Sequence, residues 1–215
     1  MFNGQAEQDK YVLTMLKNKT NGVFIEIGSN HPIKINNSYL LESKYNWTGI
    51  MVEYDKKWLN SYKINRPKSI HVINDATKID YNNLFKSNNI PKNIDYLQID
   101  LEVENKSTLN TLKKLNSEVM DKYKFAVITF EHDIYRQNYF NTREESRKIF
   151  AERGYVRVFD DINNDGHPFE DWYVHPDLVD MNFVNTIISK NKNNYKSKVN
   201  NKFLTKSINW KDIEY

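Results

Sequence analysis

The sequence predicts an α/β fold whose central sheet has about seven strands, mostly parallel, and ends in an antiparallel hairpin. Three observations support this prediction. Short apolar segments recur along the chain and end in polar or acidic residues. Stretches with helical periodicity separate these segments. Toward the C-terminus, two strand-like segments are joined by a connection that is too short for a crossover helix.

The elements follow one another in the order of βαβ units. Apolar residues from Tyr11 to Leu16 favour an opening helix within residues 6–18, and Asn21-Gly22 is a stop signal. Buried strands are then expected at 23–27, 48–53, 69–74, 94–100 and 125–131, and helices begin near 39 and span 58–65, 108–120 and 142–153. Gly154 is the expected residue just after the last of these helices.

The final two strands, at 155–160 and 169–175, flank a turn-rich segment over 162–168 and predict the antiparallel hairpin. Parallel βαβ units followed by such a hairpin form the Rossmann-like layout of methyltransferases that depend on S-adenosylmethionine (SAM). We therefore expect one domain over residues 1–189, which includes the opening helix, and a basic, polar tail over 190–215.

Composition narrows the possible functions. The chain has 215 residues with 31 Lys and Arg against 28 Asp and Glu, and much of the positive excess lies between Lys190 and Lys211. The body is close to neutral, which argues against a nucleic-acid partner. Cysteine is absent, which excludes disulfides and thiolate metal sites. No signal peptide or transmembrane segment is evident, so we expect a cytoplasmic protein, with its oligomeric state left open.

The most informative stretch is the first strand together with the turn after it. The apolar segment 23–27 contains Glu26 and leads into Gly28, which lets the backbone turn sharply and approach a ligand. Open α/β sheets bind ligands at the carboxyl ends of their strands, where these residues are expected. The segment lacks the Gly-x-Gly-x-x-Gly pattern, which disfavours a nicotinamide dinucleotide.

Six segments agree in order and spacing with one known family, at 5–12, 24–30, 37–42, 47–53, 94–104 and 127–133. On these segments the chain resembles the FkbM family of SAM-dependent methyltransferases over roughly its first four fifths. It departs from the family pattern at His31-Pro32, where Asp-Gly is common, and at residues 102–105, where Glu-Gly-x-Glu is common. Both departures fall on the expected acceptor side.

The resemblance implies SAM as the cofactor and assigns residues to its parts. Glu26, Gly28, Ser29 and Asn30 would hold the methionine end, Glu53 the ribose hydroxyls, Asp75 and Ala76 the adenine, with Asp100 also beside the cofactor. An alternative for Glu26 and Glu53 is that these strand-end acids cap the following helices. For Asp75 the alternative is an ordinary turn aspartate.

A second group of polar residues follows the fourth and fifth strands, and two mechanisms are open for it. In one, His132 or a carboxylate such as Asp100 or Glu131 takes the proton from an acceptor hydroxyl. In the other, Asp100, Glu131 and His132 bind a divalent metal ion such as Mg²⁺, which lowers the pKa of the hydroxyl. A third interpretation is that these acids only form hydrogen bonds and cap helices.

The acceptor-binding residues are expected to be Tyr39, Glu102, Asp133, Asp171 and Trp172. Trp172 could stack on a sugar face, but an aromatic residue on a hairpin also commonly packs against the sheet.

The predicted function is a SAM-dependent O-methyltransferase that acts on a hydroxyl of a sugar, glycan or glycosylated small molecule. Two alternatives stay open. One is a catalytically silent binding protein that keeps the fold. The other is a methyltransferase that acts on nitrogen or nucleic acid, for which the sequence shows no Asn/Asp-Pro-Pro-aromatic motif and no broad basic face.

Overall fold

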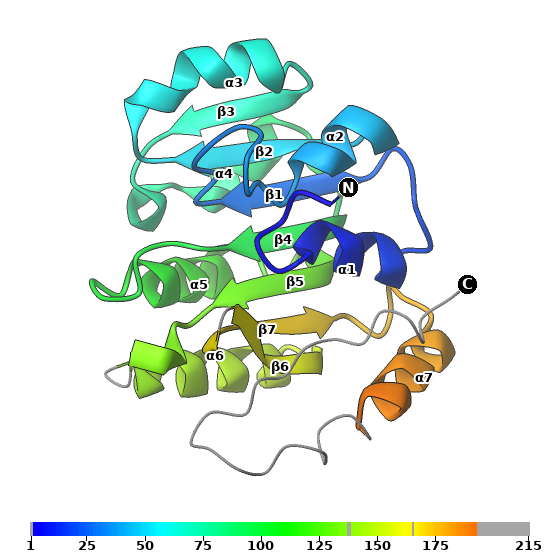
Figure 1. The fold of residues 1–215 in the computed structure, drawn as a ribbon. Coiled ribbons are helices and arrows are strands. Elements are labelled where there is room, and N and C mark those ends of the chain that lie inside the picture. The colour runs from blue at the N-terminus through cyan, green and yellow to red at the C-terminus, as the bar shows by residue number, and fades with distance from the viewer. Residues whose placement is uncertain (1, 137–138, 165, 193–215) are drawn as a thin grey trace.

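The computed structural model describes residues 2–136, 139–164 and 166–192, and a single seven-stranded sheet runs through them (Figure 1). The strand order is β3-β2-β1-β4-β5-β7-β6. The strands are β1 (Val23–Ile27), β2 (Thr48–Glu53), β3 (Ser69–Ile73), β4 (Asn93–Ile99), β5 (Lys124–Glu131), β6 (Val156–Asn164) and β7 (His167–Val174). Strands β1 to β5 pair in parallel, whereas β7 pairs antiparallel with both β5 and β6. The predicted fold class is confirmed.

Helices cover both faces of the sheet (Figure 1). One face carries α1 (Gln8–Met15), α2 (Tyr39–Tyr45), α3 (Leu59–Asn65) and α7 (Met181–Lys192), and the other carries α4 (Tyr81–Ser87), α5 (Ser107–Glu118) and α6 (Phe140–Glu152). Three short 3₁₀ turns, η1 (Lys56–Trp58), η2 (Ala76–Lys78) and η3 (Ile134–Arg136), follow β2, β3 and β5. No described helix has the length and apolar character needed to span a bilayer.

The burial of both sheet faces explains why the strands are almost continuously apolar. In β1, Phe24 packs into the apolar cluster under α1 and α2, while Ile25 and Ile27 pack into the cluster under α4 and α5. Successive side chains of a strand point to opposite faces, so a strand covered on both sides needs apolar residues at adjacent positions. Glu26 is an exception, because it lies on the α2 face and is fully buried there.

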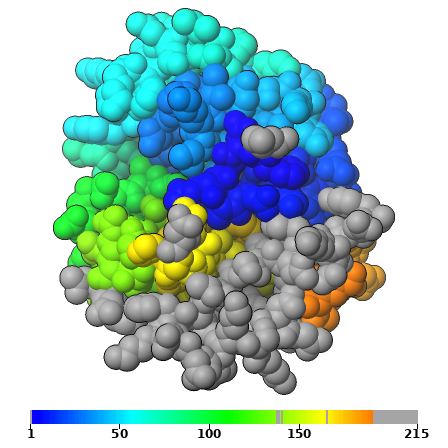
Figure 2. All heavy atoms as spheres, in the orientation of Figure 1, coloured from blue at the N-terminus to red at the C-terminus, as the bar shows by residue number. Residues whose placement is uncertain are grey.

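The N-terminal segment closes one side of the molecule. In the space-filling view (Figure 2) the first residues, in dark blue, cover the middle of the face that carries α2. Tyr11 of α1 stacks on Trp172 of β7 with ring centroids 4.6 Å apart, and Gln8 donates a hydrogen bond of 3.1 Å to Glu170. These contacts tie the start of the chain to the hairpin at its other end.

Some boundaries differ from the sequence prediction. The opening helix is shorter than residues 6–18, since Lys17 and Asn18 have positive φ and end it. Strands β6 and β7 extend further into the connection than predicted, and α4 and α7 were not predicted. Because α7 continues to Lys192, the boundary placed at residue 189 falls inside a helix. The remainder of the predicted tail, residues 193–215, lies outside the described residues.

Gly28 allows β1 and β4 to approach each other at their carboxyl ends. Its φ is +89°, a value that side chains disfavour, and a Cβ built on it would overlap the backbone carbonyl oxygen of Asp100. The close approach that the sequence predicted for Gly28 is therefore made with the neighbouring strand end. This contact brings Asp100 beside the loop after β1.

We expect Gly28→Ala to lower the free energy of unfolding by about 3 kcal/mol or more, because it adds a steric overlap of roughly 1–3 kcal/mol to the strain of positive φ. Gly166→Ala is the matched control, since Gly166 has a φ of +87° and nothing within 4 Å of the position that a Cβ would take. The control should lose only about 1–2 kcal/mol. Urea unfolding of both variants measures the difference, and equal losses would contradict the packing argument.

Candidate active site

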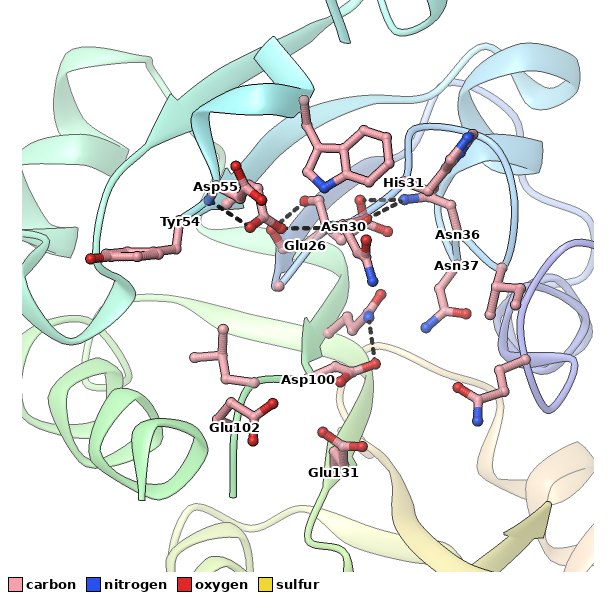
Figure 3. Close-up of a pocket in the computed structure, with 18 of the residues that line it drawn as sticks. Glu26, Asn30, His31, Asn36, Asn37, Tyr54, Asp55, Asp100, Glu102 and Glu131 are labelled. Atoms are coloured by element: carbon pink, nitrogen blue, oxygen red, sulfur yellow. Dashed lines mark hydrogen bonds between the residues drawn. The ribbon is translucent and has the colours of Figure 1, made fainter. Parts of the chain in front are cut away.

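A cavity of about 650 Å³ opens at the carboxyl ends of β1, β2, β4 and β5 (Figure 3). It lies where the strand order reverses between β1 and β4, the position at which open α/β sheets bind ligands. Most of the predicted site residues line it, namely Glu26, Gly28, Ser29, Asn30, Glu53, Asp100, Glu102, Glu131 and Asp133. Figure 3 shows Asp100, Glu102 and Glu131 gathered on one side, opposite Asn30, Tyr54 and Asp55.

The loop after β1 is held by a buried cation. The Arg66 guanidinium at the end of α3 donates to Glu42 at 2.8 Å, to the Asn36 side-chain oxygen at 2.8 Å and to Ser38 at 2.6 Å. Arg66 is fully buried, and its Nη1 lies 3.9 Å from Glu26 Oε2. A buried cation with this many acceptors fixes the path of residues 29–38 along the cavity wall.

Glu26 lines the cavity and also stabilises the segment that leads into α2. Its carboxylate accepts hydrogen bonds from the backbone N–H of Ser38, which precedes α2, and from the Asn36 side chain, both at 3.1 Å. Burial raises the pKa of Glu26, while Arg66 and the two hydrogen bonds oppose that rise. The helix-capping alternative for Glu26 thus has direct structural support, and it does not exclude ligand contact.

At the end of β2, Glu53 binds the backbone of two loops that line the cavity. Its carboxylate accepts from the backbone N–H of Asn30 at 2.7 Å and of Asp55 at 2.8 Å. Asn30 has a φ of 48°, and its carbonyl oxygen accepts from Tyr62. Tyr54 follows Glu53, lines the cavity and is 76% exposed, so its ring is free for a planar ligand.

The ends of β4 and β5 bring carboxyl groups together. Asp100 and Glu131 are close enough for a hydrogen bond between their side chains, which requires a shared proton. Burial raises the pKa of both groups, and the charge of Asp100 raises the pKa of Glu131 further. Asp133 lies nearby and forms a 3.4 Å ion pair with Arg136. This side of the cavity is able to hold and accept protons.

Gln98 lies next to this carboxyl pair. It is 3% exposed, lines the cavity, and places its Nε2 3.5 Å from Asp100 Oδ2. Its Oε1 is buried and has no hydrogen-bond partner within the described part of the chain. Buried polar atoms are almost always paired, so this oxygen indicates a donor that binds in the cavity.

Glu170 extends the acidic group beneath α1. It is fully buried on β7 and accepts from Gln8 at 3.1 Å and from Trp172 Nε1 at 2.6 Å. Burial, together with the charge of Asp100, raises the pKa of Glu170 to about 8. Glu170 is thus a protonated carboxylic acid at neutral pH.

His132 does not join the other predicted catalytic residues. Consecutive residues at the end of β5 point to opposite faces, so Glu131 lines the cavity whereas His132 is buried on the other face. There His132 Nε2 lies 3.3 Å from Asp171, which also binds Arg147 at 2.6 Å. Burial by itself would raise the pKa of Asp171, but contact with His132 and Arg147 holds this pKa well below its usual range. The catalytic assignment of His132 and the acceptor assignment of Asp171 are corrected.

The expected metal ligands are likewise separated, because His132 faces away from Asp100 and Glu131. Among the described residues, the group with three suitable ligand atoms within 4.8 Å of one another is His132, Asp161 and Asp171. Arg147 donates to both aspartates, at 2.9 Å to each, and Arg143 donates to Asp161 at 3.0 Å, so two cations balance the two carboxylates. The residues present do not fit the predicted metal ion.

Four other predicted residues lie away from the cavity lining. Asp75 accepts from Thr77 N–H at 3.0 Å and begins η2, as its turn alternative describes, and Ala76 is buried next to it. Tyr39 packs against Arg66, with 6.0 Å between its ring centroid and the guanidinium carbon. Trp172 is fully buried against Tyr11, so the packing alternative is correct for this residue.

Several lining residues were not predicted. Tyr54 and Asp55 directly follow Glu53, so the strand-end rule applied one position further could have found them. Gln98 lies inside β4 and shares a face with Asp100, which the period of two in the strand indicates once β4 is placed. Arg66 does not line the cavity but binds the loop after β1, and it gives no local signal because only tertiary packing buries it.

Comparisons with known proteins support the fold. No protein-family model matches the chain, and no curated protein matches it in sequence. Among solved structures, a protein assigned as an rRNA methylase from Clostridium thermocellum is 13% identical, with 81% of this chain and 96% of that chain covered and a TM-score of 0.53. A protein of the NADB-Rossmann superfamily from Streptococcus agalactiae is 13% identical, with 81% and 70% covered and a TM-score of 0.50. The methyltransferase domain of METTL16 is 11% identical, with 79% and 81% covered and a TM-score of 0.50. At such identities the similarity establishes a Rossmann-like methyltransferase fold.

We expect Glu170→Gln to raise the free energy of unfolding by about 1–3 kcal/mol near pH 8 and to change it little near pH 5. The folded pKa of about 8 exceeds the ordinary glutamate pKa of 4.5, so the unfolded chain loses this proton first and folding becomes less favourable as pH rises between these values. Glutamine keeps the hydrogen bonds without the ionisation. Urea unfolding at both pH values, with the exposed Glu152→Gln as control, measures the effect. An unchanged pH dependence in Glu170→Gln would contradict it.

Proposed function

We propose that this protein is a SAM-dependent methyltransferase that methylates a hydroxyl group of a sugar, glycan or glycosylated small molecule. One observation carries the proposal: carboxyl groups at or near the carboxyl ends of β1, β2, β4 and β5 line a single cavity at the point where the strand order reverses. The Rossmann-like methyltransferase fold and the resemblance to the FkbM family support the choice of chemistry.

The residues present fit the cofactor. The Glu53 carboxylate suits the ribose diol, and Tyr54 offers an exposed ring to the adenine from the adjacent position. Ser29 and Asn30 line the cavity beside the turn at Gly28, where a methionine end would bind. Bound SAM would supply an electrophilic methyl group. This arrangement leaves the carboxyl groups of β4 and β5 for the acceptor.

The acceptor side has groups for proton transfer. Burial raises the pKa of both Asp100 and Glu131. In its ionised form, either carboxylate can accept the hydroxyl proton as the oxygen forms its bond to the methyl carbon. Their raised pKa values suit a general base that works near neutral pH. This pair therefore takes the general-base role, for which the sequence offered His132 or one of these carboxylates.

A nucleic-acid acceptor fits the cavity less well, although an rRNA methylase is among the similar structures. Seven carboxyl-bearing residues line the cavity, against Lys34, Lys57 and Arg136 as the cationic ones, counted over the residues that the structure describes. Phosphate groups are bound by excess positive charge. An acidic cavity therefore supports a small acceptor without phosphate groups.

Calorimetry with SAM and S-adenosylhomocysteine tests the cofactor assignment. We expect both to bind at one site per chain, and methyl transfer from labelled SAM to occur with a hydroxyl-bearing glycan panel. Absence of binding by the folded protein would overturn the proposal. Binding without transfer to any member of the panel would favour the silent binding protein.

We expect Tyr54→Ala to weaken S-adenosylhomocysteine binding by about tenfold, because base-to-aromatic stacking contributes about 1–3 kcal/mol. Tyr54 is 76% exposed, so its truncation should leave stability nearly unchanged. Ile64→Ala is the matched control, since Ile64 is 77% exposed and does not line the cavity. Calorimetric titration of both variants provides the measurement, and equal affinities for the two would remove Tyr54 from the site.

A further inference from the structure

The acceptor side of the cavity has an excess of negative charge that no protein group balances within the described residues. Asp100, Glu102, Glu131 and Asp133 line this side, and Arg136 forms its ion pair with Asp133. Within the described ranges, the other three carboxyl groups have no ion-pair partner. Buried or partly buried carboxylates without cations are costly, and a bound positive group would relieve that cost.

Proposed binding of SAM does not remove the excess. Seven carboxyl residues and three cationic residues line the whole cavity in the described part of the chain. SAM carries a carboxylate, an ammonium and a sulfonium, and so contributes one net positive charge. Arg66, which does not line the cavity, lies 3.9 Å from Glu26, but Asp100, Glu102 and Glu131 keep no ion-pair partner among the described residues. A positively charged acceptor would balance this side of the cavity.

Gln98 adds an independent observation at the same place. Gln98 lines the cavity, and its buried Oε1 has no hydrogen-bond partner among the described residues, while its Nε2 lies 3.5 Å from Asp100. An amide oxygen and the carboxylate oxygens of Asp100 and Glu131 all accept hydrogen bonds. A ligand that fits them must donate several hydrogen bonds and carry positive charge.

We propose that the methyl acceptor of this protein carries a protonated amine, which binds between Gln98 Oε1 and the Asp100–Glu131 carboxyl pair. An ammonium group has three donors and no acceptor, and its hydrogen bonds to carboxylates are charge-assisted. The inference rests on the proposed function and narrows its substrate class to sugar-like acceptors with a free amine. The amine serves recognition, and the methyl group goes to a neighbouring hydroxyl.

A divalent cation is the competing occupant of this acidic side, and the geometry favours the amine. In the described residues, Asp100 and Glu131 have no third His, Asp or Glu ligand atom within 4.8 Å of both. A hard cation takes six or more oxygen ligands in a protein site, of which water would have to supply most here. An ammonium group needs only the three acceptors that are present.

Calorimetry on the protein saturated with S-adenosylhomocysteine tests the proposal with matched sugars. Glucosamine and galactosamine are compared with their N-acetyl forms, which keep the same hydroxyl groups but lose the charge. We expect each free amine to bind at least about tenfold more tightly than its acetylated form. Glu131→Gln and Gln98→Met should reduce this preference while the affinity for S-adenosylhomocysteine stays the same.

Glu152→Gln is the matched control, because Glu152 is exposed on α6 and does not line this cavity. It should keep the full preference for the free amine. Equal binding of free and acetylated sugars, or no binding of any free amine, overturns the inference while leaving the proposed function in place. Tighter binding of Mg²⁺ that displaces the amine also overturns it. Failure of S-adenosylhomocysteine to bind defeats the proposed function itself.

Discussion

The alternation of side chains along each strand is the constraint on which the site depends. At the end of β5 it directs Glu131 into the cavity and His132 to the opposite face, where His132 lies 3.3 Å from Asp171, which Arg147 also binds. In β4 the same period places Gln98 and Asp100 on one face. The acidic side of the cavity thus arises from residues two positions apart, whereas His132, between Glu131 and Asp133, belongs to a separate ion cluster with Asp161 and Asp171 of the hairpin.

The two sides of the cavity are stabilised differently. On the β1 side, buried Arg66 provides charge and donors for Glu42, Asn36 and Ser38, so a network of buried hydrogen bonds holds this wall. On the β4 and β5 side, Asp100 and Glu131 lie near each other without a cationic partner among the described residues, and burial raises the pKa of both, which is an arrangement that costs stability. Proteins retain such unfavourable groups chiefly where a ligand compensates them. This is consistent with a β1 side that holds the methyl donor and a β4 and β5 side that faces the methyl acceptor.

The sequence predicted the fold and nine of the residues that line the candidate site, and the residues that it missed leave only weak local signals. Strand ends such as Glu26, Glu53 and Asp100 could be found because apolar runs and the strand-end rule are local signals. His132 and Trp172 were misassigned because the sheet face to which a side chain points depends on the exact register of its strand. A shift of the strand boundary by one residue reverses that face. Arg66 and the helix α4 were missed, since a lone arginine and a seven-residue helix leave weak patterns that tertiary packing completes.

A crystal structure of the complex with S-adenosylhomocysteine is the most direct measurement of the central claim, which is that these strand-end carboxyl groups enclose one methyl-transfer site. The account predicts the ribose against Glu53, the adenine ring against Tyr54 and the sulfur facing Asp100 and Glu131. A nucleoside bound elsewhere on the protein, or bound in the cavity with its sulfur turned away from these two carboxyl groups, would contradict it.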